Sequence, residues 1–179
     1  YSTLDGPQGE GPMTYDPKRG QSVLVTNGLS DAQLWAWDGA RWSLLSTIAG
    51  KDRPFLFERS ALAYDPIRDR LVLRESFDGD LNRTWEWDWA NWVSFSPAQG
   101  EASPPQGATC RMFYDLNEER MVLVVGDSDL VEAQSTWTWD GSEWTDLTLR
   151  ERAPAPPTLR ASEMAFDASR GQVILFGGL

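Results

Sequence analysis

A nine-residue tryptophan motif recurs three times and constrains the fold more than any other feature of the chain. Its copies read LWAWDGARW at 34–42, TWEWDWANW at 84–92 and TWTWDGSEW at 136–144. Each copy is typical of a short strand with two tryptophans on one face, a turn, and a third tryptophan that opens the returning strand. The three matching positions account for nine of the ten tryptophans. The pattern therefore predicts a repeat protein.

A second motif repeats in step with the first. An aromatic residue followed by aspartate closes a short apolar stretch at four places, with steps of 49, 50 and 52 residues: Tyr15-Asp16, Tyr64-Asp65, Tyr114-Asp115 and Phe166-Asp167. A polar turn and an unbroken apolar run follow each pair, and such a run predicts a strand buried on both faces. The runs are Val23–Val25, Leu71–Leu73, Met121–Val125 and Val173–Phe176. A period near fifty indicates a propeller blade.

Each full repeat is thus predicted to contain four antiparallel strands. Asp38-Gly39 and Asp140-Gly141 are strong hairpin signals, because glycine accepts a positive φ at no steric cost. In the second copy Trp89 occupies the glycine position, and we expect Asn91 to take the left-handed conformation instead.

The spacing within the repeats separates a constant part from a variable part. The tryptophan motif's aspartate lies 27 residues before the next aromatic-aspartate pair in every repeat, whereas the distance from that pair to the following motif is 22, 23 or 25 residues. The variable segments are the loops between second and third strands, at about 27–33, 75–83 and 126–135. Variable loops on a rigid frame are where binding is expected.

These motifs resemble the bacterial kelch repeat, of the galactose-oxidase-central-domain-like superfamily. The resemblance rests on the apolar strand that ends in Gly177-Gly178 and on the Thr-Trp-x-Trp-Asp-Gly-x-x-Trp pattern. It implies an all-β fold of propeller blades, each with four antiparallel strands and the first strand nearest the central channel. Gly-Gly is complete only in the last copy, and Glu75-Ser76 replaces it in the second.

The resemblance covers most of the chain as a single propeller. The expected blades are 13–49, 61–98 and 110–149, with a partial blade at 162–179 and a possible closing strand, a degenerate copy of the tryptophan motif, within 1–12. Because rings of this kind usually have about six or seven blades, we expect the chain to be a portion of a larger propeller. The alternatives are a four-bladed ring and a blade shared between two copies. The resemblance also implies an extracellular or cell-envelope location.

Composition excludes several function classes. The net charge of −11 and pI near 4.4 would repel nucleic acid, and the apolar runs are too short to insert into a membrane. Residues 1–12 show no signal-peptide pattern. The chain lacks histidine, so it has no Ser-His-Asp triad or histidine metal site, and no cofactor is expected. The single cysteine, Cys110, is expected to be buried and inert.

The candidate binding residues lie in loops and one turn. Asp78, Asp80 and Asn82 are spaced like the start of a calcium loop, but Arg83 stands where such a loop requires glycine, so we expect a solvated loop without a metal. The same interpretation applies to Asp127 and Asp129. The tryptophans of the motif are expected to pack between blades rather than to stack on sugars. Trp89, out of register in a turn, is a candidate ligand contact.

Three arginines precede or begin first strands. Arg59 and Arg160 could direct an anion-binding group toward the channel, whereas Arg111 lies closer to its aromatic-aspartate pair and is expected to bond to a neighbouring blade. We therefore predict a non-catalytic scaffold that recognises a protein partner through the loops between second and third strands. The alternatives are a glycan-binding module and a glycoside hydrolase that uses a carboxylate pair.

Overall fold

A computed structural model describes residues 6–28, 30–50, 53–56, 59–75, 83–98, 100–126, 135–148, 162–167 and 169–177. All of the regular elements in these ranges are strands, and none of the ranges contains a helix long and apolar enough to cross a membrane. The strands are β1 (Met13–Asp16), β2 (Gln21–Asn27), β3 (Asp31–Trp37), β4 (Trp42–Ala49), β5 (Ala61–Asp65), β6 (Arg70–Arg74), β7 (Thr84–Trp87), β8 (Trp92–Phe95), β9 (Cys110–Asp115), β10 (Arg120–Val125), β11 (Ser135–Trp139), β12 (Trp144–Asp146), β13 (Ser162–Asp167) and β14 (Gln172–Gly177).

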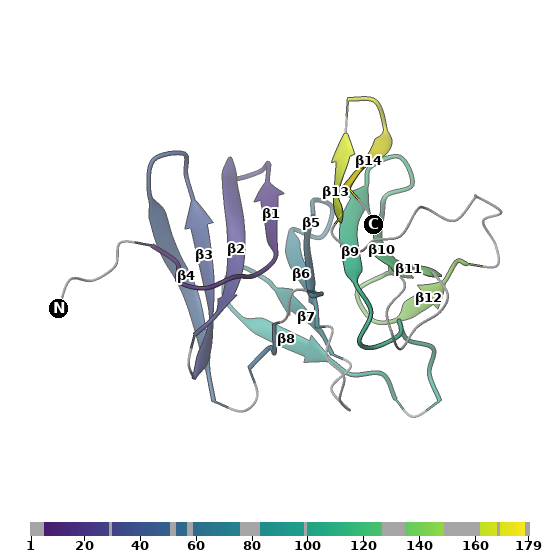
Figure 1. The fold of residues 1–179 in the computed structure, drawn as a ribbon, viewed down its shortest axis with the longest axis horizontal. Helices are drawn as coiled ribbons and strands as arrows, with labels where there is room; N and C mark the ends of the chain where they lie inside the picture. The colour runs from purple at the N-terminus through teal and green to yellow at the C-terminus, as the bar shows by residue number, and fades with distance from the viewer. Residues whose placement is uncertain are drawn as a thin grey trace.

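The strands form four antiparallel sheets, each built from consecutive strands. The first sheet contains β1 to β4, the second β5 to β8, the third β9 to β12, and the fourth β13 and β14. The sheets follow one another in chain order across the molecule (Figure 1). The all-β prediction and the four-strand repeat are thus confirmed for the three sheets whose strands are all described.

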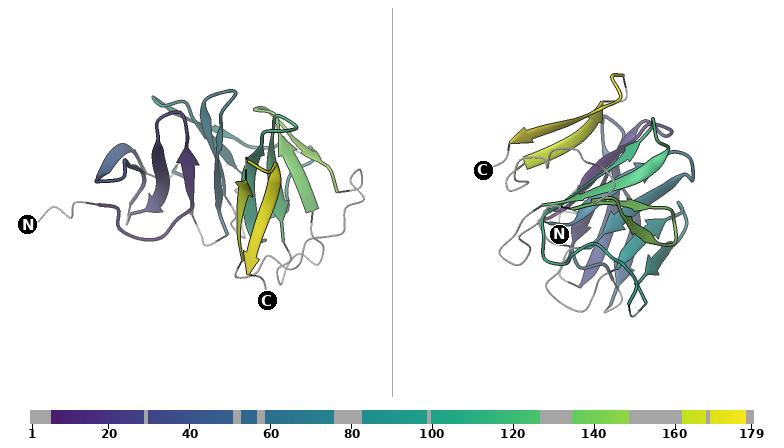
Figure 2. Two further views of the ribbon diagram at one scale, coloured as in Figure 1. Left: turned by 90° about the horizontal axis from the view of Figure 1, so that it is seen from above. Right: turned by 90° about the vertical axis from the view of Figure 1, so that its right-hand side faces the viewer.

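The first strands of successive sheets lie next to one another. β1 contacts β5, β5 contacts β9, and β9 contacts β13, so the sheets are joined along their first strands (Figure 2). The aspartate of each aromatic-aspartate pair shapes the turn after this strand, since its carboxylate accepts two backbone N–H groups; Asp65 accepts those of Ile67 and Arg68, both at 3.0 Å. This side-chain cap explains why aspartate recurs there.

The tryptophans of the second and third sheets pack on the sheet that precedes each of them. Trp85 and Trp87 share a core cluster with Val23, Val25 and Leu34 of the first sheet. Trp137, Trp139 and Trp144 in turn share a cluster with Ala61, Ala63 and Val72 of the second sheet. Burying these large side chains supplies apolar contact that a narrow four-stranded sheet cannot make alone. The predicted structural role of the motif tryptophans in the second and third sheets is confirmed.

One turn differs from the sequence prediction. Trp89 itself adopts the left-handed conformation, with φ of 71°, and Asn91 does not. The prediction for Asn91 was wrong because the Asp88 carboxylate accepts the N–H groups of Ala90 and Asn91, the pattern that Asp38 and Asp140 form in the Asp-Gly turns. The same side-chain cap thus imposes the same turn, and Trp89 must take the glycine conformation.

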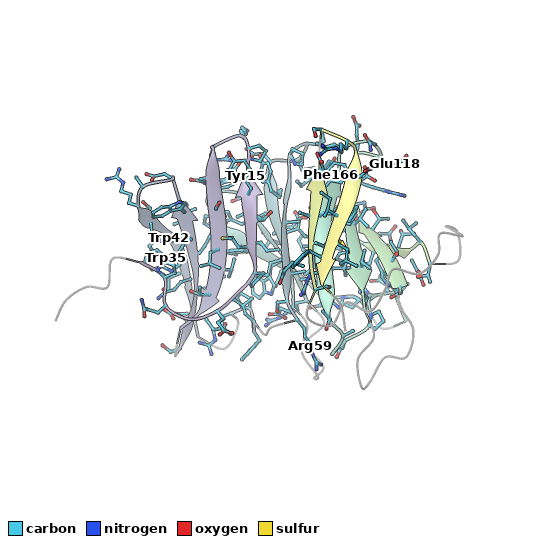
Figure 3. All side chains as sticks on the ribbon, turned by 45° about the horizontal axis from the view of Figure 1, so that its top comes forward. Tyr15, Trp35, Trp42, Arg59, Glu118 and Phe166 are labelled. Carbon is cyan, nitrogen blue, oxygen red and sulfur yellow. The ribbon has the colours of Figure 1, made fainter. Side chains whose placement is uncertain are left out.

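The two end sheets expose apolar residues that are buried elsewhere. Val173, Ile174 and Phe176 of β14 are 43%, 52% and 82% exposed, so the prediction of a strand buried on both faces was wrong for the fourth sheet. The reason is that β14 pairs only with β13 among the described strands. In the first sheet, Tyr15 is 58% exposed, whereas its counterpart Tyr64 is 5% exposed beneath the sheet before it. Figure 3 shows Tyr15 and Phe166 at the same end of their sheets.

Candidate functional site

The predicted loop contacts fall almost entirely outside the described residues. Five of the six candidates lie there, so their expected exposure and lack of a metal stay predictions: Asp78, Asp80, Asn82, Asp127 and Asp129. Within the described ranges, no group of three or more acidic, cysteine or histidine side chains is placed to hold a metal ion. The sixth candidate, Trp89, can be placed.

Trp89 lies between the first and second sheets. Its indole N–H donates to the backbone oxygen of Asp69 at 3.1 Å, and the Arg19 guanidinium stacks 3.4 Å from the ring centroid. The ring also meets Tyr64 edge-on, with 6.3 Å between the ring centroids. The half-buried Trp89 ring is therefore already engaged in packing between the two sheets, and whether it also touches a ligand stays a prediction.

Asp69 is the acidic residue that pairs with several neighbours at the same junction, between the first and second sheets. Its carboxylate accepts hydrogen bonds from Arg19, Lys18 and the Tyr64 hydroxyl. The Arg19 bonds, followed by those of Lys18 and Tyr64, hold the pKa of Asp69 well below its usual range, against the opposing effect of burial. Burial and the Asp69 hydrogen bond together raise the pKa of Tyr64 to about 12.

Acid should weaken this junction through Asp69. A carboxyl whose folded-state pKa is depressed stabilises the fold above its unfolded pKa of about 4, and that stability is lost as the pH falls below this value. We expect Asp69→Asn to remove about 1 kcal/mol at neutral pH and to flatten the acid limb of the melting temperature measured between about pH 2 and 7.

The matched control for this substitution is Glu119→Gln. Glu119 has the same turn position in the third sheet and a similar φ of 50°, and it forms no ion pair within the described ranges. Its replacement should leave the acid limb unchanged. An Asp69→Asn profile parallel to that of the wild type would show that Asp69 does not link stability to pH.

The arginines near the first strands bond to backbone oxygens of neighbouring sheets. Arg111 donates from Nε to the carbonyl of Ser162 at 2.8 Å, which confirms the predicted bond to the next sheet. Arg59 donates to the carbonyl of Gly107. Arg160 lies outside the described residues. Cys110 is 1% exposed, as expected from its position in β9. Arg111 and Cys110 line a broad hollow of about 980 Å³ between the β1 and β13 sides, which Glu10 and Glu163 also border.

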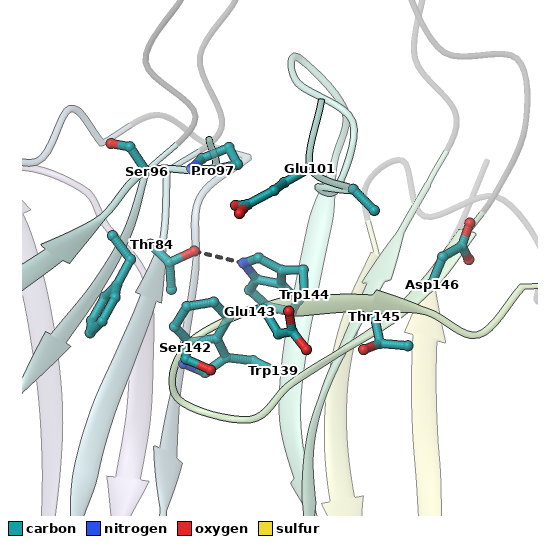
Figure 4. Close-up of a pocket in the computed structure, with 12 residues that line it drawn as sticks. Thr84, Ser96, Pro97, Glu101, Trp139, Ser142, Glu143, Trp144, Thr145 and Asp146 are labelled. Carbon is teal, nitrogen blue, oxygen red and sulfur yellow. Dashed lines mark hydrogen bonds between the residues drawn. The ribbon is translucent and has the colours of Figure 1, made fainter. Parts of the chain in front are cut away.

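A smaller pocket of about 300 Å³ lies between the outer strands of the second and third sheets (Figure 4). Trp139, Trp144 and Phe95 supply aromatic surface, and Glu101 and Glu143 supply carboxylates that flank Trp144 in the view of Figure 4. The remaining lining residues are small, hydroxyl-bearing or acidic: Thr84, Ser96, Pro97, Ala102, Ser142, Thr145 and Asp146. This mixture of aromatic surface and a few polar groups is typical of ligand sites.

Hydrogen bonds across the junction fix the aromatic side of this pocket. The Trp144 indole N–H donates to Thr84 Oγ1 of the second sheet at 2.8 Å, and that of Trp139 donates to Glu86 at 2.6 Å. Glu101 is held by its own turn, where its carboxylate accepts the N–H of Ala98 at 2.8 Å. The pocket is therefore formed before any ligand arrives, which lowers the entropic cost of binding.

Sequence reasoning missed two buried carboxylates that hold the second sheet in place. Glu86 accepts hydrogen bonds from Arg68 and Trp139. Glu75 accepts bonds from Arg83, the Trp85 indole and the Phe55 backbone N–H. Each departs from the repeat pattern, since the third sheet has Thr138 and Val125 at the matching positions. A charged residue at a position that is uncharged in the third repeat was the signal that could have revealed them.

A buried arginine accompanies Glu75. Arg74 is 1% exposed, and it donates to the backbone oxygens of Arg83 and Pro104, both at 3.1 Å. Burial lowers its pKa. The bond from Arg74 to Pro104 connects the second sheet to the segment that precedes β9. This bond lies at the end of the sheets opposite the turns that follow their first strands.

Comparisons with known proteins leave the family open. No protein-family model and no curated protein matches the chain. Among solved structures, the chain is similar to a fucose lectin from Kordia zhangzhouensis in complex with methyl-fucoside, with a TM-score of 0.47 and 16% sequence identity over 75% of this chain and 96% of that chain.

Proposed function

We propose that the protein is a non-catalytic binding scaffold and that its ligand site is the pocket between the second and third sheets. The observation that carries this proposal is the preformed mixture of aromatic surface and carboxylates, with Trp144 and Glu143 at its centre. The pocket volume of about 300 Å³ suits one side chain of a protein partner or one sugar unit. The loops between second and third strands remain the other candidate contacts with a partner.

A glycan is the second candidate ligand. The apolar face of a sugar ring packs on indole rings, while its hydroxyl groups donate to carboxylates and exchange hydrogen bonds with side-chain hydroxyls. Trp139, Trp144, Glu143 and Thr145 border the same pocket and supply these groups. Either ligand class uses the site for binding and requires no chemical step.

Filling the pocket tests the proposed site. Ala102 is an exposed lining residue, so Ala102→Trp should occlude the pocket without disturbing the core. We expect any ligand found by screening the wild type against glycans and short peptides to lose at least about tenfold in affinity. Ala40→Trp, in an exposed turn of the first sheet, is the control and should bind like the wild type. Equal affinity of all three proteins would contradict the site.

The same residues test whether the scaffold is catalytic. Two carboxylates in one pocket are the minimum that glycoside hydrolysis needs. We expect no turnover of chromogenic aryl glycosides by the wild type. Turnover that disappears in Glu101→Gln or Glu143→Gln would establish the hydrolase alternative instead.

We also propose that the four sheets are blades of a kelch-type β-propeller, secreted or in the cell envelope, and that the chain is part of a larger ring. The repeat pattern supports this, as does the contact between successive first strands. Light scattering of the 20.1 kDa chain, with the intact mass of the native protein, tests the ring size. A monomer of the given chain with a cooperative melt would favour a small closed ring.

A further inference from the structure

The pocket between the second and third sheets carries an excess of negative charge. Glu101, Glu143 and Asp146 border it, and its described lining residues include no lysine or arginine. Glu101 and Asp146 each use one oxygen to accept a backbone N–H of their own turn. Within the described ranges, none of the three forms an ion pair with a basic side chain. The described part of the pocket is thus bordered by three carboxylates and by no basic side chain, in a chain of net charge −11.

The acidic residues of the pocket are not part of the repeated sequence pattern. Aligning the tryptophan motifs of the second and third sheets places Asn91 opposite Glu143, and Ser94 opposite Asp146. The matching positions at the junction between first and second sheets are therefore neutral. An acidic residue that recurs with the motif can be explained by the structure of the repeat. An acidic residue that does not recur is more informative about a ligand.

The apolar part of the pocket lies beside the carboxylates. Phe95 meets Trp139 edge-on, with 5.3 Å between the ring centroids, and Pro97 and Ala102 extend this apolar wall. A ligand that fits must place an apolar portion against the wall and a polar or charged portion among the carboxylates. Lysine and arginine side chains have this construction, since an aliphatic stem carries the cation.

Resting on the proposed function, we infer that the pocket binds the cationic side chain of a lysine or arginine presented by a protein partner. Three carboxylates that form no ion pair among the described residues favour a positive ligand over a neutral one, and the field of the acidic chain attracts it. The indole rings of Trp139 and Trp144 add attraction for a cation that approaches them. A guanidinium can also engage two carboxylates at once, which favours arginine.

Two matched peptides test the inference on the whole chain. The probe is acetyl-Gly-Arg-Gly-amide, and its neutral counterpart carries citrulline, which has nearly the same shape without the charge. Binding is followed by the tryptophan fluorescence of the protein. We expect the arginine peptide to bind about tenfold more tightly than the citrulline peptide, and the difference to shrink as salt is raised from about 10 mM to 1 M.

Charge-neutral variants locate the effect. Glu143→Gln and Glu101→Gln should each weaken binding of the arginine peptide about two- to fivefold, as expected for partly exposed ion pairs. Glu118→Gln is the control, because Glu118 is an exposed acidic residue at the end of the third sheet shown in Figure 3, away from the pocket. It should change nothing beyond a small general salt effect.

The possible outcomes separate this inference from the proposed function. Equal binding of the two peptides, or binding of neutral methyl glycosides that Ala102→Trp abolishes, would overturn the cationic ligand and leave the pocket as the binding site. Binding of glucosamine without binding of the arginine peptide would show that the cationic ligand is an amino sugar. It would overturn the inference that the ligand is a protein partner. Ligand binding that Ala102→Trp does not weaken would overturn the proposed site itself.

Discussion

Replacing Glu75 with alanine is expected to destabilise the protein by about 3 to 5 kcal/mol, which is what removal of one partner from a buried ion pair typically costs. The Glu75 side chain is fully buried and that of Arg83 is 11% exposed, with 3.1 Å between Arg83 Nε and the carboxylate. Removal of the carboxylate would take this acceptor from the Arg83 guanidinium, the Trp85 indole N–H and the Phe55 backbone N–H. Arg83 would keep its bond to the backbone oxygen of Arg53 but would lose its anionic partner. Urea unfolding followed by tryptophan fluorescence measures the change.

Two further variants show whether charge or hydrogen bonding dominates. Glu75→Gln keeps one acceptor oxygen of the same shape and should cost less than the alanine variant, by about 1 to 2 kcal/mol. Glu118→Ala removes an exposed glutamate and should change stability by less than about 0.5 kcal/mol. A Glu75→Ala protein as stable as Glu118→Ala would mean that the buried pair contributes nothing to folding.

The second large effect is expected at Glu86, between the second and third sheets. Its carboxylate accepts hydrogen bonds from Arg68 at 2.7 Å and from the Trp139 indole at 2.6 Å, and its side chain is 9% exposed. Alanine here would leave both donors without this acceptor, at a cost of about 2 to 3 kcal/mol. Arg68 retains a second carboxylate partner in Asp65, whereas Arg83 would keep only the backbone oxygen of Arg53, so the expected loss is smaller than at Glu75. Thermal unfolding measures it.

The first sheet provides a matched comparison for Glu86. Ala36 occupies the corresponding position there, and the indole N–H of Trp87, the counterpart of Trp139, is buried without a partner in the described structure. The arginine that matches Arg68 there is Arg19, and its guanidinium is already bonded to Asp16 and Asp69. Ala36→Glu would therefore supply an acceptor for Trp87 without gaining its own arginine partner, so it should not stabilise the protein as Glu86 does. If Glu86→Ala melts at the wild-type temperature, the hydrogen bonds across this junction are not stabilising.

The repeat pattern predicted the strands because it is set by local chemistry. Each Asp-capped turn and each alternating tryptophan strand follows from a few neighbouring residues, and these features recur with little change. The prediction for Asn91 was wrong although asparagine is more common than tryptophan at a positive φ. The Asp88 cap determines which position of the turn has the positive φ, and that position holds Trp89. The packing of Trp89 offsets the resulting strain.

The candidate site could not be predicted in the same way. The pocket depends on Glu101, which lies between repeats, meeting Glu143 from the following repeat. Distances between segments far apart in the chain follow from packing and not from local pattern. The residues that the sequence analysis selected were those of a calcium-like spacing or an odd tryptophan, whereas Glu75 and Glu86 could be recognised only as exceptions to a repeat whose packing was already known.

The two junctions differ in the forces that hold them, and this difference sets an order of disassembly. The junction between the first and second sheets depends on Asp69 with Arg19 and Lys18, whose charges are partly exposed, and it leaves the N–H groups of Trp87 and Trp92 unpaired. The junction between the second and third sheets is held by hydrogen bonds that buried indole N–H groups donate. Acid and salt weaken exposed charge pairs far more than buried hydrogen bonds. The first sheet should therefore open as a separate, less protected cooperative unit in hydrogen exchange, while the second and third sheets stay joined.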